Sequence, residues 1–138
     1  MPMEKIGCVT VTQLHKQTLI YVVELPWPDR KLSPNSRGHW AVTAKAKKSY
    51  RARCHQLGLL AGLGLAPKDA KSVSVHMVFY PPDRRGRDWD NLLASMKSGL
   101  DGLADAMGVD DRRWRLAFDV SDDTVRGGAV LIRFEVPQ

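Results

Sequence analysis

Apolar and polar residues alternate most regularly over residues 72–80, SVSVHMVFY, where Val73, Val75, Met77 and Phe79 share one face. This alternation predicts a half-buried strand. The β-rich segment 18–28, TLIYVVELPWP, closes with two prolines, so it predicts a strand that runs out into a rigid loop. Two further strands are predicted at 114–120 and 129–136.

Two amphipathic helices are predicted between these strands. From about 43 to 61, apolar residues recur every three or four positions, at Ala46, Tyr50, Cys54, Leu57 and Ala61. From about 91 to 107, the apolar stripe consists of Leu93, Met96, Leu100, Leu103 and Met107, and Gly108 is suited to end the helix. The order β-α-β-α-β-β predicts one domain over residues 1–138, in the α/β or α+β class, with two main helices packed on one sheet.

Composition narrows the class of protein. The chain of 138 residues has 21 Lys and Arg against 15 Asp and Glu, a formal charge of +6, which is compatible with a nucleic-acid partner without proving one. Cys8 and Cys54 belong to no metal-binding pattern, so free thiols in a reducing compartment are expected. No apolar run approaches roughly 18 residues, and the N-terminus lacks the apolar core of a signal peptide. We therefore expect a soluble cytoplasmic protein with no membrane partner.

A pair of acids interrupts the basic stretch RRGRDWDN. If the backbone at Asp88 and Asp90 is extended, the two carboxylates point to the same side and repel each other. A guanidinium partner, a raised pKa or a divalent cation would relieve the repulsion. The alternative is structural, with Asp90 or Asn91 capping the following helix and Asp88 pairing with an arginine.

Three observations favour a cation over capping alone. Asp110 and Asp111 follow the same helix at its C-terminus, where the helix dipole disfavours negative charge unless solvent or a cation compensates. Lys97 comes seven residues after Asp90, nearly in the same direction, and its side chain is expected to lean back over Ala94. Carboxylates without nearby His or Cys match Mg²⁺, which is shared with substrate phosphates.

At these residues the chain resembles a known family. The segments LPWP, LSPNSRGHWAVTAKAKKSYR, PPDRRGRDWDNLLASMKSGLDGL and GVDD follow the order and approximate spacing seen in RusA-family crossover-junction endodeoxyribonucleases, many of them encoded by phages and prophages. The resemblance covers about residues 24–123 and is strongest at RRGRDWDN. Residues 1–17 are an unmatched N-terminal segment.

The resemblance implies a small homodimer with a mixed sheet that cuts four-way (Holliday) DNA junctions with Mg²⁺ or Mn²⁺. The essential carboxylates of the family carry over onto Asp88, Asp90 and Asp111, as metal ligands and catalytic residues. The position of the family's catalytic lysine is occupied by Ala94. Either Lys97, one turn later, takes this role, or the role is lost; we expect the first.

The chemistry of the residues agrees with this expectation. Cations held by the three aspartates would activate water and neutralise the phosphate, and Lys97 would stabilise developing charge, with no organic cofactor. The residues expected to bind DNA are Arg84, Arg85, Arg87, Asn35, Arg37, His39, Lys45, Lys48 and Arg51. For the last three, a solvated helix face is an equal alternative.

The aromatic residues have separate expectations. Trp27 is expected to be structural, and Trp89 to serve core or dimer packing. Trp40 has two open readings, an anchor of the helix start or a contact to DNA. The predicted function is a Mg²⁺-dependent endonuclease that makes paired symmetric nicks in branched DNA. The alternative is a non-catalytic DNA-binding protein of the same fold, a prophage relic.

Overall fold

Four strands form one mixed sheet in the order β1-β4-β2-β3 in the computed structural model, which describes residues 17–137. The strands are β1 (Thr18–Pro26), β2 (Val73–Tyr80), β3 (Trp114–Val120) and β4 (Ala129–Pro137). β4 pairs antiparallel with β1 and β2, whereas β3 pairs parallel with β2. This confirms the predicted fold class. The predictions for Cys8 and for the N-terminal segment fall on residues outside the described range, apart from residue 17.

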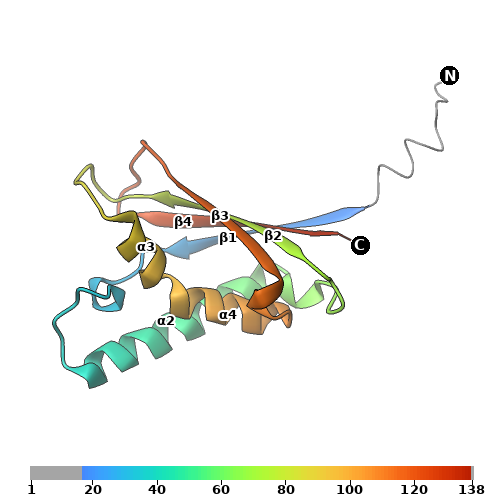
Figure 1. The fold of residues 1–138 in the computed structure, drawn as a ribbon, viewed down its shortest axis with the longest axis horizontal. Coiled ribbons are helices and arrows are strands. Elements are labelled where there is room, and N and C mark those ends of the chain that lie inside the picture. The colour runs from blue at the N-terminus through green and yellow to red at the C-terminus, as the bar shows by residue number, and fades with distance from the viewer. Residues whose placement is uncertain (1–16, 138) are drawn as a thin grey trace.

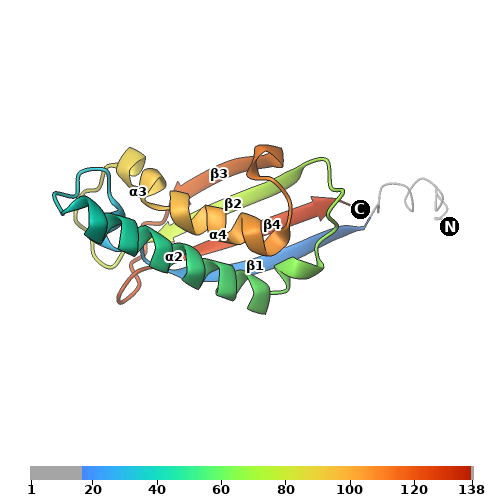
Figure 2. The same ribbon diagram turned by 90° about the horizontal axis from the view of Figure 1, so that it is seen from below.

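The helices lie on one face of this sheet (Figure 1). They are α2 (Trp40–Leu60), α3 (Trp89–Ser95) and α4 (Lys97–Met107), with short 3-10 turns η1 (Arg30–Leu32), η2 (Leu63–Leu65) and η3 (Asp111–Arg113). Figure 2 shows α4 across the middle of the sheet, α2 toward the β1 edge and β3 at the opposite edge. Within residues 17–137, no helix has both the length and the apolar character needed to cross a bilayer.

The core forms between the apolar face of the sheet and the apolar stripes of the helices. Met77 pairs with Ile132 and Phe79 with Val130 across β2 and β4, and all four side chains are buried. Removing these apolar surfaces from water is the main force that holds helices and sheet together. On the other face of β2 and β4, polar residues such as His76 and Arg133 are exposed, as period-two alternation requires.

The single helix predicted over 91–107 is wrong. The structure has two helices, α3 and α4, separated at Met96, and α3 begins at Trp89 because Asp88 caps it. At the end of α3, the Ser95 hydroxyl donates to the Asn91 carbonyl at 2.7 Å, and such bonding to the preceding turn bends helices. The Met96 N–H then bonds to Leu93, only three residues back, at 3.1 Å.

The helix predicted over 43–61 begins earlier, at Trp40. His39 Nδ1 accepts a hydrogen bond from the Ala41 N–H at 3.1 Å and so satisfies a donor that the first turn leaves free. The predicted stripe is confirmed, because Tyr50 and Cys54 are buried and Ala46 packs against the core. The strand predicted within 18–28 spans Thr18–Pro26, and Trp27 and Pro28 lie in the loop that follows it, as expected.

Close packing of α2 against α4 positions charged side chains of both helices. Gly102 lies so near the Arg51 carbonyl that no Cβ fits between them, and Gly99 leaves a similar space for Tyr50. The guanidinium of Arg51 then pairs with Asp105 at 2.8 Å. The small residues of α4 therefore determine how near the basic side of α2 comes to it.

Candidate functional site

A cavity of about 1180 Å³ opens beside α3, between the first half of α2, the start of α4 and β3. Three of the four predicted catalytic residues line it, from three separate elements: Asp90 from α3, Lys97 from α4 and Asp111 from η3. Its other polar lining residues include Lys47, Lys48, Arg51 and Asp101, and its apolar lining includes Leu93, Trp114 and Leu116. The fold thus gathers acids and cations at one hollow.

Lys97 is held between two carboxylates of this cavity. Its Nζ lies 2.9 Å from Asp101 Oδ1 and 3.4 Å from Asp111 Oδ2. Hydrogen bonding to Asp101, followed by weaker attraction to Asp111, raises the pKa of Lys97 above its usual value. The side chain does not lean back over Ala94 as predicted, because its partner lies one turn ahead. Sequence reasoning missed Asp101, although the Lys97–Asp101 spacing of four is typical of helical ion pairs.

Asp88 has a structural task at the start of α3. Its Oδ1 accepts a hydrogen bond from the Asp90 N–H at 3.1 Å, the geometry of a helix N-cap. The alternative in which Asp90 or Asn91 caps the helix is therefore wrong. Asp88 does not line the cavity, whereas Asp90 in the first turn of α3 does.

The second acidic pair divides between two tasks. Asp110 caps η3, accepting from the Arg112 N–H at 2.9 Å and pairing with its guanidinium at 3.0 Å. These contacts lower the pKa of Asp110, the Arg112 N–H contributing most. Asp111 instead lines the cavity and contacts Lys97. Arg112 and Lys97 thus compensate the negative charge that follows α4. The sequence alone did not show whether solvent or a cation would do so.

The carboxylates near the cavity do not form a complete metal site by themselves. Within residues 17–137, no three or more His, Cys, Asp or Glu side chains are arranged to hold a metal ion, so Asp88, Asp90 and Asp111 do not form a preassembled triad. Asp90 and Asp111 nevertheless line one cavity. Mg²⁺ commonly uses one or two carboxylates, water and substrate phosphates. Asp90 and Asp111 are therefore the residues that could hold such a cation together with a phosphate ligand.

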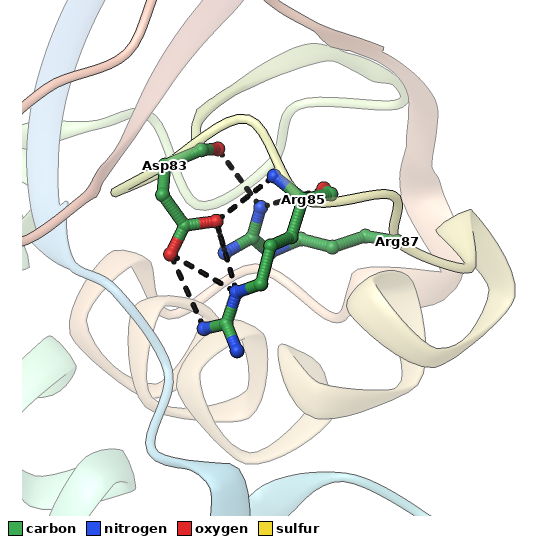
Figure 3. A network of polar contacts seen from close by, with 3 residues as sticks. All are labelled: Asp83, Arg85 and Arg87. Carbon is green, nitrogen blue, oxygen red and sulfur yellow. Dashed lines mark hydrogen bonds and ion pairs between the residues drawn. The ribbon is translucent and has the colours of Figure 1, made fainter.

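The arginine cluster before Asp88 organises its own loop (Figure 3). Asp83 accepts hydrogen bonds from the Arg85 N–H at 3.0 Å and from Arg87 Nη2 at 2.8 Å, and Arg85 Nη2 pairs with it at 3.2 Å. Arg85 and then Arg87 hold the pKa of Asp83 well below its usual range. Sequence reasoning missed Asp83, which takes the arginine-pairing role considered for Asp88.

Arg87 and Arg85 differ in their freedom to meet a ligand. Arg87 has only 18% of its side chain exposed, donates to the Asp83 and Arg85 carbonyls at 3.0 Å, and lies over the Trp27 ring at 5.5 Å. Arg85 has 82% of its side chain exposed, and Arg84 is exposed as well. Trp27 also packs edge-on against Phe79, as expected for a structural residue.

The basic residues of α2 divide between two hollows. Lys48 and Arg51 line the large cavity, together with Lys47, which sequence reasoning missed even though it shares their side of the helix. Lys45 lines a different hollow, of about 490 Å³, beside Arg53. The three predicted residues of α2 therefore do not form one surface.

The loop before α2 and two tryptophans complete the list of predicted residues. Asn35 and Arg37 are exposed, and His39 caps α2. Trp40 is 77% exposed, so it does not anchor the helix start in the core. Trp89 is 56% exposed and contacts Phe118, so it lies at the surface rather than in the core.

Comparisons with known proteins give one clear relative. An uncharacterized protein from Xylella fastidiosa (strain Temecula1) is 38% identical over 133 residues, which cover 96% of this chain and 83% of that protein. None of the protein-family models compared with the chain matches it. The solved structure "IspF (Plasmodium falciparum) CDP complex" has a TM-score of 0.37 and 9% identity, covering 89% of this chain and 98% of that one, a likeness too low to support an inference. The chain therefore belongs to the same protein family as the Xylella fastidiosa protein.

Proposed function

We propose that this protein is a cytoplasmic, Mg²⁺-dependent endodeoxyribonuclease that resolves four-way DNA junctions as a homodimer. One observation carries the proposal: Asp90, Lys97 and Asp111 line the same cavity as Lys48 and Arg51. The sequence resemblance to RusA-family nucleases supports the same assignment. A homodimer would present two identical sites to the approximate two-fold symmetry of a junction and so make paired nicks.

The side chains of the cavity suit a phosphodiester. Lys48 and Arg51 would bind DNA phosphates at one wall, where Arg51 is oriented by its ion pair with Asp105. Asp90 and Asp111 would hold a divalent cation that neutralises phosphate charge and acidifies water, whereas Asp88, also expected as a ligand, caps α3 outside the cavity lining. Lys97 would oppose charge that develops on the phosphate, because its contacts with Asp101 and Asp111 favour the ammonium form.

A specific observation favours the second candidate, a DNA-binding protein without catalysis. Asp88 already serves as the cap of α3, Asp111 is paired with Lys97, and the described residues contain no preassembled group of three metal ligands. In this candidate, the same cations bind branched DNA while the acids only cap and pair.

Cleavage of a labelled synthetic four-way junction, beside a linear duplex of the same sequence, separates the two candidates. The proteins are the wild type, Asp90→Asn and the matched control Asp122→Asn, an exposed aspartate that does not line the cavity. We expect symmetric paired nicks in the junction alone, abolished by EDTA and by Asp90→Asn, and unchanged in the control.

Binding to the same DNA distinguishes loss of a metal ligand in Asp90→Asn from loss of the fold. Asp90→Asn is expected to bind the junction as tightly as the wild type, or more tightly, because one negative charge near the phosphates is removed. Tight junction binding by the wild type without cleavage, over a range of Mg²⁺ and Mn²⁺ concentrations, would support the non-catalytic candidate instead.

A further inference from the structure

An exposed tryptophan at the start of α3 packs against a half-buried phenylalanine of β3. Trp89, in the first turn of α3, is 56% exposed, and its ring centroid lies 5.8 Å from that of Phe118 on β3, with the rings tilted by 36°. Leu116 and Val120, which share a face of β3 with Phe118, are 41% and 43% exposed. The apolar surface thus continues from the cavity, which Leu116 lines, to the start of α3.

The residues around Trp89 make this surface different from an ordinary apolar patch. Asp88 and Asp90 are its chain neighbours, and consecutive Cα atoms are about 3.8 Å apart. Asp90, the next residue along the chain, lines the cavity with Lys97, whereas Trp89 itself lies outside the cavity lining. Arg85, four residues before Trp89, has 82% of its side chain exposed. A ligand that fits this arrangement is anionic and carries a flat apolar group.

A nucleotide has both properties. Its phosphate suits the cations of the cavity, Lys48 and Arg51 among them. Its base suits an exposed indole, because every base has a π face that stacks on aromatic side chains. A base inside a continuous duplex must first be unstacked and unpaired before it can reach a protein side chain. At the crossover of a four-way junction the helical stacks are interrupted, so less stacking has to be broken there.

We infer that Trp89, supported from behind by Phe118, is a stacking platform for one base at the branch point of the DNA. The inference rests on the proposed function and deepens it, because it names the feature of the substrate that the site recognises. Trp89 then favours branched over linear DNA, whereas the lysines and arginines bind phosphates of either form.

Equilibrium binding in EDTA tests this inference without requiring cleavage. The probes are a four-way junction with 2-aminopurine at the branch point and a linear duplex of the same sequence. Trp89→Leu keeps an apolar contact with Phe118 but removes stacking, whereas Trp89→Phe keeps an aromatic ring. The control is Leu65→Ala, which truncates a side chain that is 84% exposed on η2, at the end of α2 away from α3 (Figure 2).

We expect Trp89→Leu to weaken junction binding roughly 5- to 100-fold and to change duplex binding less than twofold. Wild-type protein should also quench 2-aminopurine at the branch point, and Trp89→Leu should not. Trp89→Phe should retain most of both effects, and Leu65→Ala should match the wild type. Circular dichroism of each variant establishes that the fold is intact.

Three other outcomes overturn the inference in distinguishable ways. Junction binding by Trp89→Leu equal to that of the wild type removes the stacking role but leaves the proposed function standing. A shift from dimer to monomer in Trp89→Leu, seen by sedimentation, assigns the surface to contact between copies. Failure of the wild type to bind either DNA overturns the proposed function together with this inference.

Discussion

The ammonium nitrogen of Lys97 lies 3.4 Å from a carboxylate oxygen of Asp111, a residue fourteen positions later in the chain. This contact joins the start of α4 to the turn that follows it, and both residues line the cavity. Asp101, at 2.9 Å, holds the same ammonium from the next turn of α4. A positive charge is therefore fixed at the wall of the proposed phosphate site.

Replacing Lys97 by alanine is expected to slow junction cleavage by about 100-fold, the usual effect of removing one group that stabilises transition-state charge. Lys97→Arg should recover part of the rate, since it restores the charge in a different geometry. Single-turnover cleavage at saturating protein measures the rate separately from binding. Lys71→Ala, an exposed lysine that does not line the cavity, is the control, and equal rates for Lys97→Ala and the control would exclude a role in catalysis.

Asp83→Asn is expected to loosen the loop that leads to Asp88. The substitution removes the charge that pairs with both Arg85 and Arg87, so trypsin should cleave after these arginines faster than in the wild type. Asp122→Asn, on an exposed turn, should leave the cleavage pattern unchanged. Wild-type cleavage rates in Asp83→Asn would mean that the other contacts of the loop hold it without this carboxylate.

The ion pairs of Asp83 with Arg85 and Arg87 also predict a pH dependence of stability. Because Arg85 and Arg87 lower the pKa of folded Asp83, its contribution is fully present above its ordinary pKa near 4 and is lost as the pH falls through the folded value. The difference in Tm between the wild type and Asp83→Asn should therefore be constant from pH 5 upward and shrink below about pH 4. A difference that persists unchanged at low pH would contradict this assignment.

Gly102→Ala is expected to destabilise the fold by about 1–3 kcal/mol or more, the usual cost of overpacking, even though alanine favours helices. The added methyl group would meet the Arg51 carbonyl, which belongs to the backbone and cannot turn away. Urea unfolding measures the change. Gly86→Ala is the matched control, because nothing lies within 4 Å of the position that its Cβ would take. Similar stability for both variants would show that α2 and α4 can separate at no cost.

The Cys54 thiol is expected to react slowly in the folded protein. Burial raises its pKa to about 12, so in a Cys8→Ser background a disulfide reagent at pH 8 should label it quickly only in denaturant. Because the pKa is higher in the folded state, the protonated thiol contributes to the free energy of unfolding. This contribution is fully present below the usual thiol pKa near 8.5 and decreases as the pH rises toward 12. Cys54→Ala should reduce this alkaline loss of unfolding free energy. Rapid labelling without denaturant would contradict the buried position.

The local pattern of the sequence was enough to predict the elements of the fold. The strand at 114–120 and the stripe of α2 follow from period-two and period-3.6 alternation, which depends only on which neighbouring residues must leave water. The resemblance to RusA-family nucleases implied one site made of Asp88, Asp90, Lys97 and Asp111; the structure places the last three on one cavity and leaves Asp88 out of its lining. The local pattern missed the break at Met96, where Ser95 bonds to the turn before it.

Local patterning was enough to predict the strands, the two helical regions and the kinds of charge between them. The pairing of those charges depends on the folded chain. Asp83 rather than Asp88 pairs with the arginines, Lys97 turns toward Asp101, and Lys45 lines a different hollow from Lys48. The reason is physical: periodicity is set by adjacent residues, whereas the partner of a long charged side chain depends on loops and on helix packing that bring distant segments within a few ångströms.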